Sequence, residues 1–351
     1  ESSLEKGLIY IGTDDYSPIR EFSSENFEND AYAFNTKSGL IFNEASPIGY
    51  RPPGFLGAGY FMADNPDLGV KLTYFIKKSV KTLKSKRQEK EKESASISYP
   101  TKKQIRNEKN EIKPYLIIAI NDSNGKPVRR ITKPYSKGIH RINWDGKVYR
   151  KDNPSRGAYF ANAGDYYYQI IGYKEGSFDT LLTSKKFSLN HLNNLTLPAL
   201  DDELINFQAL SNSTLRDFDK FQMSLDETID LAKKLGKALK ATPEASLKDL
   251  EELNYQEDLL REIVIEINGD ADISAKEFEV LPGLGERLSI ATWGSFSMRS
   301  KPTSTMKEQI RIVREVLPRL EKKLEEILYA IEKIETRNEA FGIPYVRGFE
   351  D

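Results

Sequence analysis

The chain has 351 residues, enough for two or three domains of ordinary size, and its formal net charge is −1 because 52 Lys and Arg face 53 Asp and Glu. That balance argues against a nucleic-acid-binding protein. The chain has no Cys and two His, which excludes disulfides, thiolate zinc sites and cysteine nucleophiles and leaves little for multi-histidine metal sites or a His-based triad. We therefore predict no catalytic residue, no cofactor and no metal site.

No stretch of the sequence predicts a transmembrane segment. The longest aliphatic run, residues 116–120, is far shorter than the roughly 20 residues that a spanning helix needs. Residues 1–6 have neither the basic start nor the apolar stretch of a signal peptide. Composition alone leaves two alternatives, a cytosolic protein and a mature or truncated form of an exported one.

Residues 1–69 are rich in Gly, Pro, Tyr and Phe and show no helical period. Short strands are expected at residues 7–12, 31–34 and 39–42, and the remainder predicts a loop-rich wrap. A segment of this kind rarely folds alone, so we expect it to pack on a neighbouring domain.

Residues 70–192 predict an immunoglobulin-like β-sandwich. Short runs with the alternating apolar pattern of half-buried strands are separated by turn signals such as Asn124-Gly125. The expected strands are residues 70–76, 115–120, 128–131, 139–144, 166–173 and 181–189.

An insertion at residues 77–113, here called the basic arm, interrupts this pattern. It contains 13 Lys and Arg against 5 Glu, a net charge of +8. The composition favours a solvated, helical or mobile excursion between two strands. A phosphate-binding role is the alternative, although the run lacks the interleaved aromatic residues typical of single-strand nucleic-acid binders.

From Leu200 onward the apolar period becomes helical, and the segment 200–351 carries a net charge of −10. Three helices are expected, over residues 218–239, 250–267 and 310–334, with Pro318 kinking the last. Short links imply antiparallel neighbours, so we predict an antiparallel three-helix coiled-coil bundle. The third helix has the most regular a/d ladder: Ile310, Val313, Leu317, Leu320, Leu324, Ile327, Ile331 and Ile334.

Several motifs that could carry chemistry favour structural roles instead. Residues 54–59 (Gly-Phe-Leu-Gly-Ala-Gly) lack the spacing and the strand-to-helix context of a dinucleotide loop. The pairs Asp14/Asp15 and Asp201/Asp202 could supply glycosidase carboxylates, but a turn and a helix N-terminus account for them.

Two histidines and a tyrosine run also favour structural roles. His140 is expected to pack on the same strand face as Ile142 and Trp144, and His191 to face solvent in a linker. Residues 166–168 place one Tyr outward, a candidate contact for sugar or protein. Three short matches to the N-glycosylation acceptor begin at Asn121, Asn194 and Asn212.

Several of these residues carry a family resemblance. Residues 7–15 (Gly-Leu-Ile-Tyr-Ile-Gly-Thr-Asp-Asp) resemble a blade strand of sortilin/Vps10-like, BNR-repeat β-propellers of secreted bacterial proteins, which are often labelled glycosyl hydrolases. Residues 15–21 resemble the segment by which such chains leave the propeller, and residues 45–47, 65–66 and 70–74 resemble the downstream region. The sandwich motifs at 128–130, 142–145 and 164–166 are similar to the immunoglobulin-like domain of flagellar hook-capping proteins, and residues 293–295 and 301–303 to the link into the last helix.

The chain departs from that family because most of the propeller is missing. A propeller typically needs four to eight blades of about 40 or more residues each, and no Ser-x-Asp-x-Gly-x-x-Trp box occurs. We expect a shortened or partly represented version of a longer propeller protein. Residues 1–69 then form the propeller-remnant strands and wrap, 70–192 the sandwich and 200–351 the helical bundle. No family site residue can be transferred.

These observations favour a non-catalytic, extracytoplasmic binding or assembly module of a secreted or cell-surface bacterial protein: periplasmic, outer-membrane-associated or secreted. Its partner would be a protein or glycan at the cell envelope. The ladder buries itself or docks a partner, and the basic arm would contact an acidic surface. The alternative is an accessory region of a carbohydrate-active enzyme whose site lies in the missing propeller. A cytosolic scaffold is a third possibility.

Overall fold

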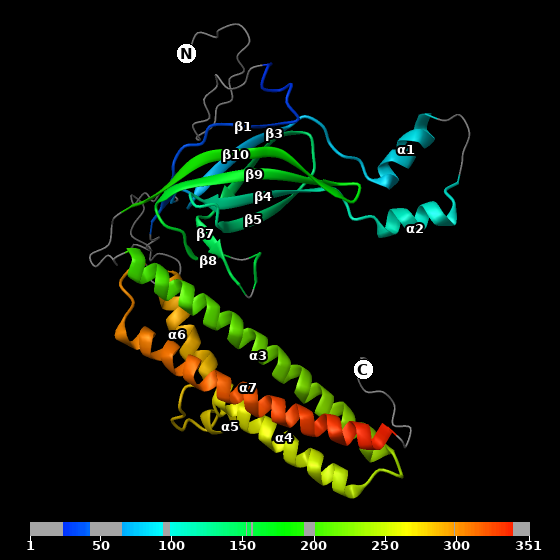
Figure 1. Ribbon diagram of the computed structural model, residues 1–351, viewed down its shortest axis with the longest axis vertical. Helices are drawn as coiled ribbons and strands as arrows, with labels where there is room; N and C mark the ends of the chain where they lie inside the picture. The colour runs from blue at the N-terminus through cyan, green and yellow to red at the C-terminus, as the bar shows by residue number, and fades with distance from the viewer. Residues whose placement is uncertain are drawn as a thin grey trace, which may run out of the picture. The chain divides into compact units, whose positions relative to one another are not determined.

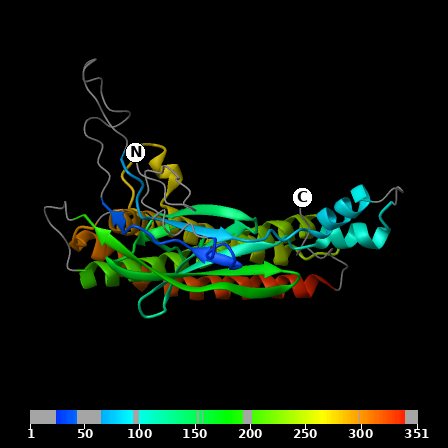
Figure 2. The same ribbon diagram turned by 90° about the horizontal axis from the view of Figure 1, so that it is seen from above.

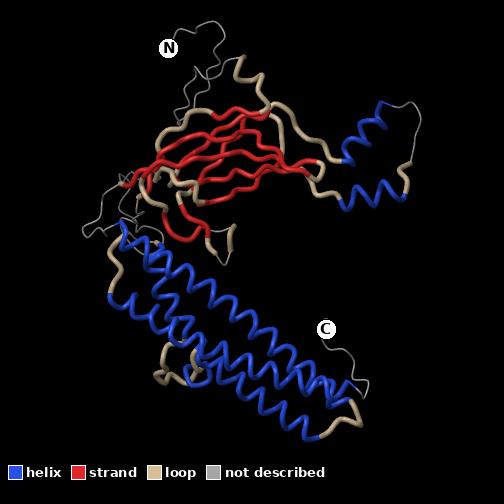
Figure 3. Tube along the Cα trace, in the orientation of Figure 1, coloured by secondary structure: helices blue, strands red, loops and turns tan. Residues whose placement is uncertain are grey.

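The computed structural model describes residues 24–42, 65–93, 99–151, 153–155, 157–192, 201–297 and 299–339. The chain divides into two compact units, Glu1–Asn194 and Leu195–Asp351 (Figure 1). In the described residues, strands are confined to the first unit, while the second consists of helices joined by loops (Figure 3). The predicted combination of β and α regions is therefore confirmed at this level.

The first unit contains three sheets. A three-stranded antiparallel sheet has the order β1 (Ala31–Ala33), β3 (Val70–Ile76), β6 (Gly138–Trp144). A five-stranded sheet has the order β2 (Gly39–Ile41), β10 (Ser177–His191), β9 (Gly164–Lys174), β4 (Tyr115–Asp122), β5 (Pro127–Pro134). A two-stranded ribbon joins β7 (Lys147–Tyr149) to β8 (Gly157–Phe160). All six strands predicted after residue 70 are confirmed, whereas β7 and β8 were not predicted.

The two larger sheets bury their apolar residues in one shared core. Leu72 and Tyr74 of β3 and Ile118 of β4 are all at most 1% exposed. Trp144, 1% exposed, packs its ring edge-on against Tyr166 and Phe187, with centroids 5.3 and 5.8 Å apart. The alternating pattern of the sequence thus reflects strands with one face in this core.

The described part of residues 1–69 packs on the sheets, as expected. β1 pairs with β3 in the antiparallel direction, and β2 pairs with β10 in the parallel direction across about 150 residues. The strand predicted at residues 7–12 lies outside the described residues, as do Asp14, Asp15 and the glycine-rich motif at 54–59.

The second unit contains α3 (Asp201–Ala241), α4 (Leu247–Asn268), the one-turn α5 (Ala271–Ser274), α6 (Leu284–Phe296) and α7 (Ser304–Glu339). The three predicted helices lie within α3, α4 and α7, and the whole predicted ladder of α7 is buried in one core. α7 continues through Pro318, whose predicted kink stays a prediction.

Helix α6 was not predicted, and it contacts α3, α4 and α7. The buried face of α6 includes small and polar residues, which do not produce a helical apolar period in the sequence: Thr292, Gly294 and Ser295. Trp293-Gly-Ser295, expected in a link, lies inside this helix. Helix α6 was missed because these small residues give no apolar period, although they allow a neighbouring helix to approach closely. At Gly294, a Cβ would lie 2.3 Å from the side chain of Met306 in α7.

Candidate binding arm

The basic arm forms two helices, α1 (Leu83–Glu93) and α2 (Lys102–Asn110), between β3 and β4. Figures 1 and 2 both show these helices extending past the end of the sheet from which they leave. Neither helix contains a buried residue. The arm therefore adds nothing to the core of its unit, and its side chains remain available to solvent and to a partner.

Local capping interactions define where each arm helix begins. Thr101 and Gln104 form a capping box at α2, in which each side chain accepts the backbone N–H of the other residue. At α1, the two carboxylate oxygens of Glu111 accept the N–H of Leu83 at 3.0 and 2.8 Å, and Thr82 Oγ1 accepts the N–H of Ser85. Lys, Arg, Glu and Gln supply most of the remaining positions, and all are good helix formers.

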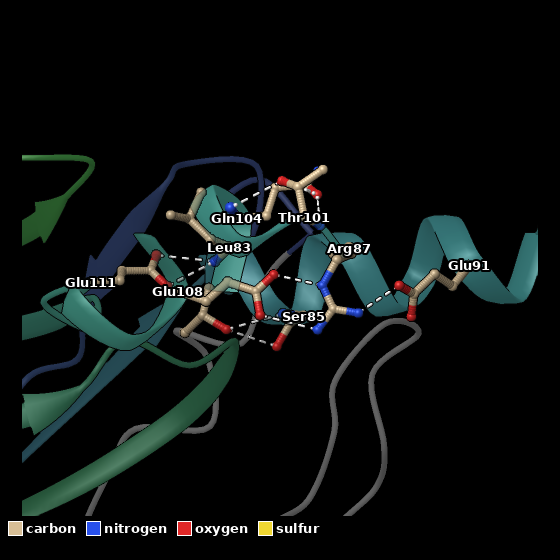
Figure 4. A network of polar contacts seen from close by, with 9 residues as sticks. Leu83, Ser85, Arg87, Glu91, Thr101, Gln104, Glu108 and Glu111 are labelled. Atoms are coloured by element: carbon tan, nitrogen blue, oxygen red, sulfur yellow. Dashed lines mark hydrogen bonds and ion pairs between the residues drawn. The ribbon is translucent and has the colours of Figure 1, made fainter. Parts of the chain in front are cut away.

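One arginine joins the two helices. Arg87 of α1 donates from Nε and Nη2 to the two carboxylate oxygens of Glu108 in α2, at 2.6 and 3.0 Å (Figure 4). A third hydrogen bond links Arg87 to Glu91 at 2.5 Å. The two hydrogen bonds from Arg87 to Glu108 lower the pKa of Glu108, and their bidentate geometry fixes the relative position of the helices.

The outward face of α2 is cationic. Lys102, Arg106 and Lys109 follow one another at spacings of four and three residues, so they lie on one helix face, and all three are exposed. Ile105, 51% exposed, is their neighbour on the helix surface. No ion pair involves these three cations among the described residues, so their charge faces solvent.

Most acidic residues of the arm are already engaged. Glu91 and Glu108 contact Arg87, Glu89 lies 2.5 Å from Lys81, and Glu111 caps α1. Glu93 is exposed at the end of α1. Internal pairing of the carboxylates explains how an arm with a net charge of +8 stays folded while most of its lysines point outward.

A pocket of about 420 Å³ lies at the root of the arm, lined by Asp30, Lys78, Lys81, Lys86, Tyr135 and Lys174 among others. Three of its lysines are paired with carboxylates: Lys81 with Glu89, Lys86 with Glu175, and Lys174 with Asp179 at 2.7 Å. Three of these four lysines are thus compensated, whereas Lys102, Arg106 and Lys109 of α2 all lack an ion pair among the described residues.

Most of the residues singled out in the sequence are held in the fold by packing or by hydrogen bonds. His140 is half-buried beside Tyr74, with Nε2 2.8 Å from the Ser136 carbonyl oxygen, as predicted. His191 was expected in a solvent-facing linker. That expectation is wrong, because His191 belongs to β10 and its Nε2 lies 2.8 Å from the Ala161 carbonyl oxygen.

The tyrosine run, the Asp201/Asp202 pair and two of the glycosylation matches can be placed as follows. Tyr166 and Tyr168 are buried in the core, and Tyr167 is the half-exposed member of the run. Asp201 and Asp202 open α3, as predicted. Asn212 is 2% exposed inside α3, so this acceptor match cannot be reached by a glycosylating enzyme in the folded protein, and Asn194 lies outside the described residues.

Asp145, the last residue of the 142–145 motif, lies in the turn after β6. Its Oδ1 accepts the N–H of Lys147 at 3.1 Å, which is a turn-forming contact. The described residues contain no group of three or more His, Asp or Glu suited to a metal ion. Within the same part of the chain, no helix combines the length and apolar character needed to cross a membrane.

Sequence reasoning did not identify the Arg87–Glu108 contact or the α2 stripe. Thr101-x-x-Gln104 is a capping-box signature and could have located the start of α2. Once the helix was located, the spacing of Lys102, Arg106 and Lys109 would have placed all three on one helix face. No comparable signal exists for the partner of Arg87, which lies 21 residues away.

Comparisons with known proteins provide no family. No protein-family model and no curated protein matches the chain. A solved structure named "pT26-6p" is 14% identical over 64% of this chain and 42% of its own length, with a TM-score of 0.10. The chain thus spans about two fifths of that structure's length, and a similarity this low supports no argument.

Proposed function

We propose that the chain is a non-catalytic binding or assembly module that captures an acidic partner with the basic arm. The observation that carries this proposal is the outward face of α2, where Lys102, Arg106 and Lys109 lie together and take part in no ion pair among the described residues. An acidic partner surface would supply the missing counter-charges and steer the encounter over a distance of about one Debye length.

The energetics of the arm support this role. Like charges three or four residues apart on a helix destabilise it by about 0.2–0.5 kcal/mol per pair. Isolated helices as short as α1 and α2 are also marginal in water. The capping contacts and the Arg87 pair offset these costs without burying apolar surface. The arm is thus held in a defined shape that presents cations, which a simple connecting loop would not require.

We also propose a specific architecture for each unit. The two larger sheets share one core around Trp144, which supports an immunoglobulin-like sandwich of the hook-capping type. The contacts among α3, α4 and α7 and the buried α7 ladder support a three-helix coiled-coil bundle, to which α6 is added.

We propose further that the chain corresponds to the region following a sortilin/Vps10-like BNR-repeat propeller, in a protein that acts outside the cytoplasm at the cell envelope. Two of the resembling motifs support this: residues 142–145 end β6 and open the following turn, and residues 164–166 begin β9. The partner would be an acidic protein or glycan.

The test compares two triple variants of equal charge change. Lys102→Gln/Arg106→Gln/Lys109→Gln removes the stripe, and Lys220→Gln/Lys240→Gln/Lys322→Gln removes three exposed lysines from the helical unit. Fluorescein-labelled polyglutamate serves as the acidic probe, and fluorescence anisotropy measures its affinity between 20 and 300 mM salt, about the range over which the Debye length falls from roughly 20 Å to below 8 Å.

We expect the arm variant to bind polyglutamate at least tenfold more weakly at low salt, with a smaller dependence on salt, while the control variant binds as the parent does. Because the six side chains are exposed, far-UV circular dichroism and the unfolding midpoint should be unchanged in both. Equal affinity of the arm variant and the parent would exclude the proposed role of the stripe.

A further inference from the structure

An exposed acidic loop with apolar side chains joins α4 to α6. Residues 270–281, here called the acidic loop, contain four Asp and Glu and one Lys, for a net charge of −3. Every residue from Ala271 to Leu281 is exposed. Figure 1 shows the loop, which includes α5, standing out from the helices of its unit. The loop therefore presents its whole length to solvent.

The ends of the acidic loop are held together by two glycines. A Cβ on Gly283 would lie 2.3 Å from the Ile267 carbonyl oxygen and 2.6 Å from the Gly269 nitrogen, so only glycine allows this approach. Gly269 closes α4 with a φ of +79°. Arg287 also donates to the Pro282 carbonyl oxygen at 3.2 Å. The loop is thus anchored at its base, like the compact surface loops that frequently carry function.

Large apolar side chains on the loop have no cover among the described residues. Phe278 is 67% exposed and Leu281 84% exposed. On α6, which follows, Ile290 and Trp293 are 41% and 77% exposed and lie on one helix face because they are three residues apart. Single exposed apolar residues are ordinary, but these four, two of them aromatic, all fall within residues 278–293 and make this stretch a candidate interaction surface.

The basic arm has the complementary properties. It carries a net charge of +8 against −3 for the acidic loop, and it also exposes apolar side chains beside its charges, Ile105 at 51%, Ile112 at 65% and Tyr99 at 86%. The two surfaces carry opposite charges, and both also expose apolar side chains that a contact between them could bury. Docking one on the other would remove both apolar sets from water and neutralise the α2 stripe.

We propose that the acidic loop binds the basic arm of a second copy of this chain. This inference rests on the proposed function, because it names the acidic partner of the arm. The contact joins two different surfaces, so it is heterologous, and it propagates into a ring or an open chain of copies. The chain then assembles head to tail, in a manner that salt weakens.

Sedimentation velocity of the full chain tests the assembly. At 20 mM salt the weight-average mass should rise with protein concentration above that of one chain, and at 500 mM salt it should fall back, since the Debye length is then only a few Å. Phe278→Ser/Leu281→Ser should weaken association at least tenfold. Met223→Ser/Tyr255→Ser removes two large side chains that are 65% and 61% exposed on α3 and α4 and should have no effect.

A charge exchange identifies the pairing. The variant Lys102→Glu/Arg106→Glu and the variant Glu277→Lys/Glu279→Lys should each fail to associate, and a chain carrying all four changes should associate again. A chain that stays at the mass of one copy under all conditions would overturn the inference. So would association that persists in both single-surface variants.

The outcome is separable from that of the proposed function. If the α2 stripe binds polyglutamate but the chain stays monomeric, the acidic partner is a different molecule and only the second-copy inference fails. If the charge exchange restores association while polyglutamate does not bind, general capture of acidic partners fails and the specific contact stands.

Discussion

Gly69 holds a tightly constrained position in the first unit. It has a φ of +90°, and a Cβ at this position would lie 1.8 Å from the Trp144 carbonyl oxygen. Its N–H and carbonyl oxygen both pair with Leu40, which ties the described part of the N-terminal region to the sheet. Backbone conformation and close approach therefore both require glycine here.

We predict that Gly69→Ala lowers the free energy of unfolding of the first unit by more than about 2 kcal/mol, because conformational strain and a steric clash add. Gly125 provides the control: its φ is +78°, but no atom lies within 4 Å of a Cβ, so Gly125→Ala should cost only about 1–2 kcal/mol. Urea unfolding followed by Trp144 fluorescence in a Trp293→Phe background measures both. Equal losses would show that φ alone matters.

At the scale of elements, the arm hairpin depends on ionised carboxylates. Arg87 holds the pKa of Glu108 below its ordinary value of 4.5. A carboxyl whose pKa is lowered in the folded state contributes stability that is fully present above its unfolded pKa and is lost as the pH falls through the folded pKa. The stabilisation that the Arg87–Glu108 contact gives to the packing of α1 against α2 should therefore be constant from neutral pH down to about pH 4.5. Below that pH it should weaken.

We predict that the α2 signals in NMR spectra lose helical character below about pH 4.5 in the parent chain. Glu108→Gln should weaken the hairpin already at pH 7 and remove most of this pH dependence, because the glutamine carries no charge at any pH. Glu93→Gln removes the same charge from an exposed position of the arm and should leave the titration unchanged. A pH profile that is the same in the parent and in Glu108→Gln would contradict the assignment.

At the scale of the whole molecule, the two units have separate cores. The core around Trp144 is built from strands, and that around the α7 ladder is built from helices. Separate cores allow the units to unfold in separate transitions. The two tryptophans make this measurable, because Trp144 is buried in the first unit while Trp293 is 77% exposed in the second.

We predict that Leu320→Ala destabilises the helical unit by about 2–5 kcal/mol, since this side chain is 0% exposed in its core. Circular dichroism at 222 nm should show an earlier urea transition, while Trp144 fluorescence in the Trp293→Phe background should not shift. Met223→Ala, at a position 65% exposed, should change neither signal much. A parallel shift of both signals would mean that the units unfold together.

Local patterns were sufficient for the elements that expose one face and bury the other. The alternation of residues 70–76 and the ladder of α7 each repeat within a few residues, so the sequence alone predicts their type and their buried face. The same reasoning failed for α6, whose buried face includes small and polar residues, and for His191, whose surroundings come from a residue 30 positions away.

Sequence by itself therefore determined the charge separation, the strand and helix periods and the presence of a basic arm. Tertiary structure alone decided that β2 lies beside β10, that Arg87 meets Glu108, and that Gly269 and Gly283 close the acidic loop. The physical reason is range. Periodicity and capping act between residues a few positions apart, whereas these contacts join residues brought together only when the chain packs.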